Sequence, residues 1–302
     1  MTSPITDYQD KVAVITGGAS GVGKALARML LDRGAHVVVA DVEQSALDAA
    51  VDNLKGRSAG QVLGVLTDVT DPKSVHALAD QAFDTFGRVN LLFNNAGVGA
   101  PSAKVWETTP NDWHWVHAVN LFGVAYGIQA FVPRMIESGE PGFVANTTSG
   151  DGAITPMPTA SVYASSKAAV AITTECLAAQ LQEIGANVAA GLLFPSGRGL
   201  ISTGMWTADR NRHSKWDRER PRPEVSPEIQ AMKDRAQQAA EQNREMFEAD
   251  LDALANAILD GILAGNYVLT IGEFDTSVAR LRERADRYEQ NLNPVGEPGG
   301  AH

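Results

Sequence analysis

The sequence has little cysteine, no long hydrophobic run and no basic leader. Cys176 is its only cysteine, which excludes an internal disulfide framework and a cysteine-rich zinc site. No window holds about 18 consecutive apolar residues. The first residues, MTSPITDYQDK, lack the basic and then apolar pattern of an export signal. We therefore expect a cytoplasmic protein with no membrane partner.

The sequence also lacks an excess of positive charge. Lys and Arg total 25 of the 302 residues and Asp and Glu total 36, which gives a net charge of −11. Such a chain repels a phosphate backbone, so nucleic acid is not expected as a partner. His114 and His117 share a predicted helix face without a third ligand, and no metal site is expected.

Short apolar runs alternate with longer amphipathic segments along the chain. The expected strands are residues 12–15, 37–40, 62–66, 91–93, 143–147, 188–194 and 267–271. The expected helices are residues 24–33, 44–54, 72–86, 110–138, 161–184 and 251–263. This βαβ series predicts a doubly wound α/β Rossmann fold, with a seven-stranded parallel sheet and helices on both faces.

No linker or internal repeat divides this series, so residues 1–302 are expected to form a single domain. A polar, partly helical insertion at about residues 196–249 follows the sixth strand, where an α/β enzyme commonly carries a substrate lid. The insertion includes a basic run, Arg210 to Arg222, whose simplest interpretation is a solvated loop. Residues 293–302 are rich in Gly and Pro and are expected to form a flexible tail.

A glycine-rich turn follows the first strand and opens a helix. In this turn Gly17, Gly21 and Gly23 surround Ser20 and Val22. Glycines let the backbone approach a pyrophosphate at the positive end of a helix. A strand before the turn and a helix after it give the pattern its context, and it predicts a dinucleotide site.

Asp41 ends the second strand, where a carboxylate can accept hydrogen bonds from both ribose hydroxyls of an adenosine. Neither Ser20 nor Val42 is a cation that could receive a 2′-phosphate, so the motif predicts NAD as the cofactor. The alternative is that Asp41 only caps the helix that follows.

A phenol and an ammonium lie four residues apart in a predicted helix, at Tyr163 and Lys167. They share a helix face, and a neighbouring cation favours the phenolate that acid–base catalysis requires. Ser149 follows the fifth strand and could share a substrate oxygen with Tyr163. Asn120 is an unfavourable residue for a helix interior unless its amide has a partner. Asn95, Ala96 and Gly97 close the fourth strand and suit a flat ligand.

These residues, in this order, resemble the short-chain dehydrogenase/reductase family over about residues 11–271. The resemblance implies that Tyr163 is the general acid/base, that Lys167 also holds the nicotinamide ribose, and that Ser149 orients the substrate. It further implies that Asn120 holds a water in a proton relay, that Asp68 and Val69 contact adenine, and that Pro195 lies at the nicotinamide.

The chain departs from the family pattern at three places. Asn90 stands where the family commonly has aspartate, and we expect an effect on strand packing. The loop before Tyr163 is longer than usual, so the choice of Ser149 over Thr148 rests on the alignment. The family's Pro-Gly after the sixth strand reads Pro195-Ser196-Gly197 here, with extra residues before Ile201-Ser202-Thr203.

The function expected from these features is hydride transfer between NAD and a secondary alcohol or ketone, on a bulky cyclic or hydrophobic substrate. The alternative is an inactive NAD-sensing protein on the same fold. A homotetramer is expected because the helices at 112–135 and 161–180 carry apolar residues on several faces, including Trp115, Val116 and Phe122.

Overall fold

The computed structural model describes residues 3–57, 60–195, 204–221, 231, 238, 244–272 and 275–294. Seven parallel strands form one sheet in the order β3-β2-β1-β4-β5-β6-β7. The strands are β1 Val12–Thr16, β2 His36–Asp41, β3 Val62–Leu66, β4 Leu91–Asn94, β5 Gly142–Thr147, β6 Val188–Leu193 and β7 Val268–Leu269. This confirms the predicted parallel sheet, although β7 is shorter than expected.

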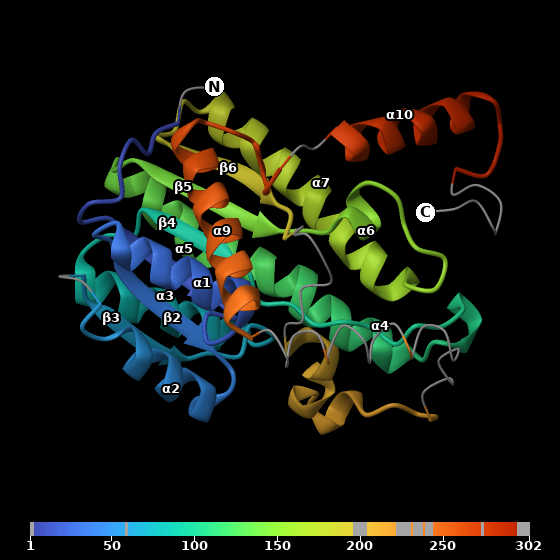
Figure 1. Cartoon of the computed structure of the whole chain (residues 1–302), viewed down its shortest axis with the longest axis horizontal. Coiled ribbons are helices and arrows are strands. Elements are labelled where there is room, and N and C mark those ends of the chain that lie inside the picture. The colour runs from blue at the N-terminus through green and yellow to red at the C-terminus, as the bar shows by residue number, and fades with distance from the viewer. Residues whose placement is uncertain are drawn as a thin grey trace.

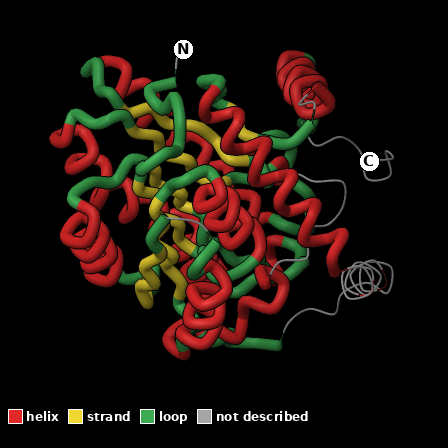
Figure 2. Tube along the Cα trace, turned by 60° about the vertical axis from the view of Figure 1, so that its left-hand side comes forward, coloured by secondary structure: helices red, strands yellow, loops and turns green. Residues whose placement is uncertain are grey.

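Helices cover both faces of the sheet, as predicted (Figure 1). On one face lie α1 Gly21–Asp32, α2 Gln44–Leu54 and α9 Arg244–Leu263. On the other lie α3 Pro72–Phe86, α5 Gly123–Ser138 and α7 Ser161–Glu183. Figure 2 shows the strands between these helical layers.

Alternate residues of each strand supply the two apolar cores. Ala13 and Ile15 of β1 pack in the cluster with α1 and α9, whereas Val12 and Val14 pack with α3, α5 and α7. This is the period-two alternation of a strand, and both sets are apolar because both faces are covered. The cores hold the strand ends in a fixed arrangement.

The strand order reverses between β1 and β4, so their connections leave on opposite sides of the sheet. In register, Ile15 pairs with Phe93 and Thr16 with Ala40. Parallel strands present their carboxyl ends at one edge, and ligands bind at such a switch point. The turns after β1, β2, β4 and β5 therefore meet there.

One long helical segment changes from α-helical to π-helical hydrogen bonding near its middle. It comprises α4 Pro110–His117, a π-helical turn η2 Ala118–Phe122, and α5. Among the described residues it is the stretch long and apolar enough to span a membrane by length and composition, and 56% of its most apolar window is buried. It packs against α3 and α7, as a core helix does.

The structure corrects the prediction for the apolar surface of this segment. Trp115 and Val116, which were expected at a subunit interface, are 1% and 0% exposed and lie in a third apolar cluster with Val98. Phe122 is 48% exposed. The surface left over by the core is therefore smaller than the sequence pattern indicated.

Two helices differ from the prediction. Helix α9 begins at Arg244, seven residues before the expected start. Helix α10, Asp275–Glu289, was not predicted, because charged residues dominate it and mask the apolar spacing of Val278 and Leu281. It lies apart from both helical layers (Figures 1 and 2), and Arg284 donates to the Ile154 carbonyl at 3.0 Å.

The insertion after β6 is described in part. Its described residues form the 3₁₀ helices η3 Gly204–Asn211 and η4 Ser214–Trp216. Most of the insertion between residues 222 and 243, where its helical part was expected, falls outside the described residues, as do Ser196, Gly197 and the end of the tail. Shorter elements are η1 Val105–Glu107 and α6 Gly150–Ala153.

Candidate active site

A cavity of about 530 Å³ lies at the carboxyl edge of the sheet, along the turns after β1, β2, β4 and β5. Most of the predicted site residues line it: Gly17, Ser20, Gly21, Val22, Asp41, Asp68, Val69, Asn95, Ala96, Gly97, Ser149, Tyr163, Lys167 and Pro195. Gly23 and Asn120 do not line it, and lie behind its wall. The structure thus brings the predicted residues to one place.

The glycine-rich turn places the start of α1 at the cavity. Gly17 and Gly21 have φ angles of +63° and +51°, a region that disfavours side chains. A Cβ on Gly23 would lie 2.4 Å from the Gly17 carbonyl oxygen, so only glycine allows the helix to approach the turn this closely. The Ser20 side chain makes no capping bond. The first amides of α1 therefore form an anion-binding end.

The turn after β4 holds the glycine-rich turn in position. The Asn95 side-chain amide donates to the Thr16 carbonyl at 2.9 Å. The Thr16 hydroxyl accepts from the backbone amides of Asn95 and Ala96 at 3.0 and 3.1 Å. Asn95 is thus part of the scaffold as well as of the lining. Thr16 was missed in the sequence, because a strand-end threonine carries no distinctive pattern.

Tyr163 and Ser149 form the chemical centre of the cavity. The Ser149 side chain lies within reach of the Tyr163 phenol and accepts from the Asp151 amide at 3.1 Å. Burial raises the pKa of Tyr163 to about 12; the Ser149 hydrogen bond lowers it and the Asp151 charge raises it further. The neighbouring Thr148 hydroxyl donates to the Lys167 carbonyl, 2.8 Å away, and does not line the cavity.

Lys167 is buried beneath this pair, with 2% of its surface exposed. Its ammonium donates to the Thr147 carbonyl at 2.8 Å and lies 5.9 Å from the centre of the Tyr163 ring. Burial lowers the pKa of Lys167 to about 8. In this arrangement the ammonium faces a carbonyl, and the lowering of the Tyr163 pKa by Lys167 stays a prediction.

Asn120 lies in the π-helical turn η2 and is fully buried. Its amide accepts from the Val98 amide at 2.8 Å and donates to the Val98 carbonyl at 3.0 Å and the Ser166 hydroxyl at 3.1 Å. These bonds occupy the Asn120 side-chain amide, which inside a helix would otherwise compete for backbone hydrogen bonds. π-Helical turns are frequent at functional sites. Asn120 connects the β4 turn to α7, the helix of Tyr163.

Carboxylates gather at the opposite end of the cavity. Asp41 accepts from the Ala19 amide and from the Glu43 amide, both at 3.1 Å, so it does fix the local turn. Burial raises the pKa of Asp41. Asp68 accepts from the Thr70 amide at 2.9 Å. Burial opposes the Asp68 charge, but hydrogen bonds from His213 and Thr70 leave its pKa below the ordinary value.

The insertion reaches this acidic end, which sequence reasoning did not foresee. Arg210 bonds Glu43, the Asn211 amide donates to Glu43 at 2.7 Å, and His213 lies 2.7 Å from Asp68. Arg210, Asn211 and His213 also line the cavity. The insertion thus supplies a guanidinium at Glu43, two residues after Asp41. No local pattern could reveal contacts across more than 100 residues.

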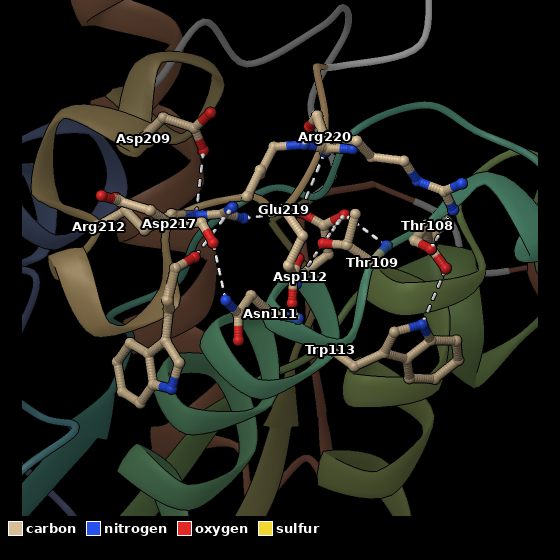
Figure 3. A network of polar contacts seen from close by, with 12 residues as sticks. Thr108, Thr109, Asn111, Asp112, Trp113, Asp209, Arg212, Asp217, Glu219 and Arg220 are labelled. Carbon is tan, nitrogen blue, oxygen red and sulfur yellow. Dashed lines mark hydrogen bonds and ion pairs between the residues drawn. The ribbon is translucent and has the colours of Figure 1, made fainter.

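Buried ion pairs attach the insertion to α4. Asp112 is fully buried, caps α4 with Thr109, and accepts from Arg212 at 2.9 Å and Arg218 at 3.0 Å. Arg212 also lies over the Trp115 ring, 4.3 Å from its centre. Figure 3 shows Arg212 reaching from the insertion to Asp112. These ion pairs hold the insertion on α4, because moving the arginines away would leave the Asp112 carboxylate buried without its partners.

The basic run is exposed over most of its described residues, as expected for a solvated loop, but two of its arginines are buried. Arg212 and Arg218 are 5% and 10% exposed on Asp112, and Arg220 donates to the Thr108 carbonyl at 2.8 Å. Arg222 lies outside the described residues. These arginines bind protein groups, so they give no support to an anchor for an acidic substrate.

The cavity end near Tyr163 is mainly apolar. Its lining there includes Ala100, Met157, Ala160 and, from the insertion, Met205. Asp151 is the acidic exception; its carboxylate accepts from the Met157 amide at 2.7 Å. Within the described part of the chain no group of three or more His, Cys, Asp or Glu is arranged to hold a metal.

Comparisons with known proteins agree with this geometry. The family model described as short chain dehydrogenase matches residues 11–213. The fold is similar to a short chain dehydrogenase/reductase from Burkholderia phymatum in complex with NAD, with a TM-score of 0.85 and 34% identity, over 98% of this chain and 100% of that one.

Two curated relatives act, by their names, on cyclic hydroxy compounds. The 1-deoxy-11-beta-hydroxypentalenate dehydrogenase of Streptomyces avermitilis is 37% identical over 198 residues, 65% of this chain and 71% of the relative. The cis-4-hydroxycyclohexanecarboxylate dehydrogenase of Sinomonas cyclohexanicum is 39% identical over 182 residues, 60% of this chain and 71% of the relative.

Proposed function

Because this chain belongs to the short-chain dehydrogenase family, we propose that it is an NAD-dependent oxidoreductase acting on a secondary alcohol or the corresponding ketone. The observation that carries the proposal is that Ser149, Tyr163 and the buried Lys167 line the same cavity. A proton-exchanging phenol at the mouth of an apolar pocket is the arrangement that this reaction requires.

The residues present fit a dinucleotide. The start of α1 offers backbone amides for a pyrophosphate, and the positive φ angles of Gly17 and Gly21 leave the backbone accessible there. Asp41 at the end of β2 suits the adenosine ribose, while Lys167 and Pro195 lie at the other end of the same cavity. When bound, NAD supplies the acceptor for a hydride.

In this proposal Tyr163 and Ser149 act on the oxygen of the substrate. During oxidation the Tyr163 phenolate takes the hydroxyl proton, while the Ser149 hydroxyl donates a hydrogen bond to the oxygen and holds it in place. The proton moves in the opposite sense during reduction. Since burial raises the pKa of Tyr163 in this cavity, oxidation needs a group that stabilises the phenolate.

Lys167 is the residue that can supply that stabilisation. Among the described residues no carboxylate forms an ion pair with its buried ammonium, which donates to the Thr147 carbonyl, and burial lowers its pKa to about 8. A phenolate formed on Tyr163 would provide the missing negative charge. Asn120 would act by positioning, since its side chain is fully used in joining Val98 to Ser166.

For the substrate we propose a bulky cyclic or otherwise hydrophobic alcohol. The apolar lining from Ala100, Met157, Ala160 and Met205 supports this, as do the cyclic hydroxy compounds in the names of the two relatives. Asp151 would repel a carboxylate placed next to the reacting carbon. NAD as the cofactor favours oxidation as the direction in the cell.

The test is to mix the protein with NAD and a panel of cyclic and open-chain secondary alcohols and to follow nicotinamide absorbance. We expect reduction of NAD with cyclic alcohols and little with 2-propanol. Binding of NADH without turnover of any alcohol or ketone in the panel would instead identify an NAD-sensing protein.

We also propose a homotetramer in the cytoplasm. The exposed Phe122 on the long helical segment and Ile172 on α7, which is 60% exposed, leave apolar surface for self-association. Light scattering at micromolar concentration tests this, and a monomeric mass would contradict it.

A further inference from the structure

Arg210 lies at the acidic end of the cavity, where the proposed function places the adenosine ribose. It belongs to the insertion, yet it lines the same cavity as Asp41 and Glu43 at the end of β2. Glu43 and Asp41 are joined directly, because the Glu43 amide donates to the Asp41 carboxylate at 3.1 Å. A guanidinium therefore stands beside the position at which a dinucleotide with a 2′-phosphate would carry its extra charge.

Glu43 holds that guanidinium. The Arg210 Nε donates to Glu43 at 3.1 Å, and a second nitrogen of the same guanidinium bonds the other carboxylate oxygen. This is a two-point contact, the geometry in which arginine binds carboxylate or phosphate most strongly. Arg210 lowers the pKa of Glu43, which keeps the carboxylate charged at neutral pH.

We propose that Glu43 and Arg210 form a specificity-determining pair, in which Glu43 occupies the guanidinium that would otherwise bind a 2′-phosphate. The proposal rests on the proposed function. It adds a second source of NAD preference to Asp41: one carboxylate repels the phosphate, and the other neutralises the cation that could attract it. Specificity of this kind arises as much from penalties on the wrong ligand as from contacts with the right one.

The charges at this end of the cavity agree with the proposal. Asp41, Glu43 and Asp68 contribute three negative charges and Arg210 one positive charge, so the net local charge opposes a phosphate even when His213 beside Asp68 is counted as positive. Removing the Glu43 charge leaves Arg210 opposite Asp41 and able to turn toward a phosphate, since 45% of its side chain is exposed. Thr207 accepts from the same guanidinium at 2.7 Å and keeps it at the cavity.

The experiment measures binding rather than turnover. Protein fluorescence gives the dissociation constants of NADH and NADPH, and calorimetry gives that of adenosine 2′,5′-bisphosphate, for the wild type and for Glu43→Gln. We expect Glu43→Gln to bind NADPH and the bisphosphate about tenfold more tightly, the worth of one charge-assisted contact, with NADH binding changed less than about threefold.

Two further variants identify the cause. Adding Arg210→Ala to Glu43→Gln should abolish the gain, because the gain requires the guanidinium. Asp80→Asn removes a carboxylate from a comparable pair, 2.9 Å from Arg134 and outside the cavity, and should leave NADPH binding unchanged. Thermal unfolding midpoints of all variants show whether each is folded.

Three results would overturn the inference. NADPH affinity could be unchanged in Glu43→Gln, the gain could persist after Arg210→Ala, or Asp80→Asn could produce an equal gain through net charge alone. A wild-type protein that binds neither NADH nor NADPH would instead overturn the proposed function, so the two failures are distinguishable.

Discussion

The two ends of the cavity are built in different ways. At the Tyr163 end, Tyr163 and Lys167 come from adjacent turns of α7, and Ser149 comes from the short turn between β5 and α6, with a buried core behind them. At the Asp41 end, carboxylates that follow two strands meet side chains from the insertion. Arg210 is 167 residues away from its partner Glu43 in the sequence, and His213 is 145 residues away from its partner Asp68.

We infer from this difference that the Tyr163 end carries the chemical step and that the Asp41 end selects the nucleotide. The Tyr163 end depends on a short helical spacing and on burial, so its variants should change the rate of reaction. The Asp41 end depends on charges supplied by distant segments, so its variants should change which nucleotide binds and how tightly.

The largest effect is expected from Tyr163→Phe. Removing the proton-exchanging hydroxyl should lower kcat by about 10²- to 10⁴-fold, the range for general acid–base catalysis, with the NADH dissociation constant within about threefold of wild type. Steady-state kinetics and NADH fluorescence on one preparation check this, and Tyr126→Phe on α5 is the matched control. Full activity in Tyr163→Phe would mean that another acid performs the step.

Lys167→Ala should change both the rate and nucleotide binding, because Lys167 lies beside Tyr163 and is also expected to hold the nicotinamide ribose. We expect kcat to fall about 100-fold, since the phenolate loses its cation, and NADH binding to weaken as well. The same two assays apply, with Lys55→Ala at an exposed helix end as the control. Unchanged NADH affinity would show that Lys167 does not touch the nucleotide.

Asp112→Asn should loosen the insertion. Removing the carboxylate takes away the buried negative charge that the Arg212 and Arg218 guanidiniums share, and we expect a loss of about 3 kcal/mol in the free energy of unfolding. Denaturant unfolding measures it, and weaker NADH binding should accompany it because the segment carries Arg210 and His213. A stability equal to wild type would show that the pairs do not anchor the segment.

Exchanging charge at the strand end should alter cofactor choice by about tenfold. Asp41→Ser combined with Val42→Arg removes a repulsive carboxylate and adds a cation, which should shift kcat/KM from NAD toward NADP. The wild type supplies the first check: equal kcat/KM with NADP and NAD would refute the role of Asp41 before any variant is made.

The smallest effect concerns pH and stability. Because burial lowers the pKa of Lys167 to about 8, the unfolded chain binds more protons than the folded one between about pH 8 and 10.5, and stability from this group rises with pH in that window. Relative to Lys167→Met, the wild type should gain about 1 kcal/mol per pH unit from pH 8.5 to 10. A flat difference would show that Lys167 titrates normally.

Sequence reasoning reached the sheet and the Tyr163 end because local patterns determine them. Buried parallel strands are continuous apolar runs, and Tyr163 and Lys167 reveal their shared face by spacing alone. Asn90 is likewise placed as expected: it accepts from the Val12 amide at 3.0 Å and so affects strand packing. The family model and the Burkholderia phymatum structure confirm the Rossmann fold.

The rest depended on contacts that no local pattern records. The insertion was assigned to the substrate, yet its described residues also cover the Asp41 end through Arg210 and His213. The basic run was read as solvated because charged residues usually are, but Asp112 buries two of its arginines. Helix α10 was missed because few apolar residues mark its face.

The central claim, hydride transfer from a carbinol carbon, is tested most directly with a deuterated substrate. The alcohol that gives the fastest turnover in the panel is prepared with deuterium on its carbinol carbon, and the reduced nicotinamide is examined by mass spectrometry. Our account predicts that the deuterium moves to the cofactor and that Tyr163→Phe abolishes this transfer. Oxidation of the alcohol with no deuterium on the cofactor would contradict it.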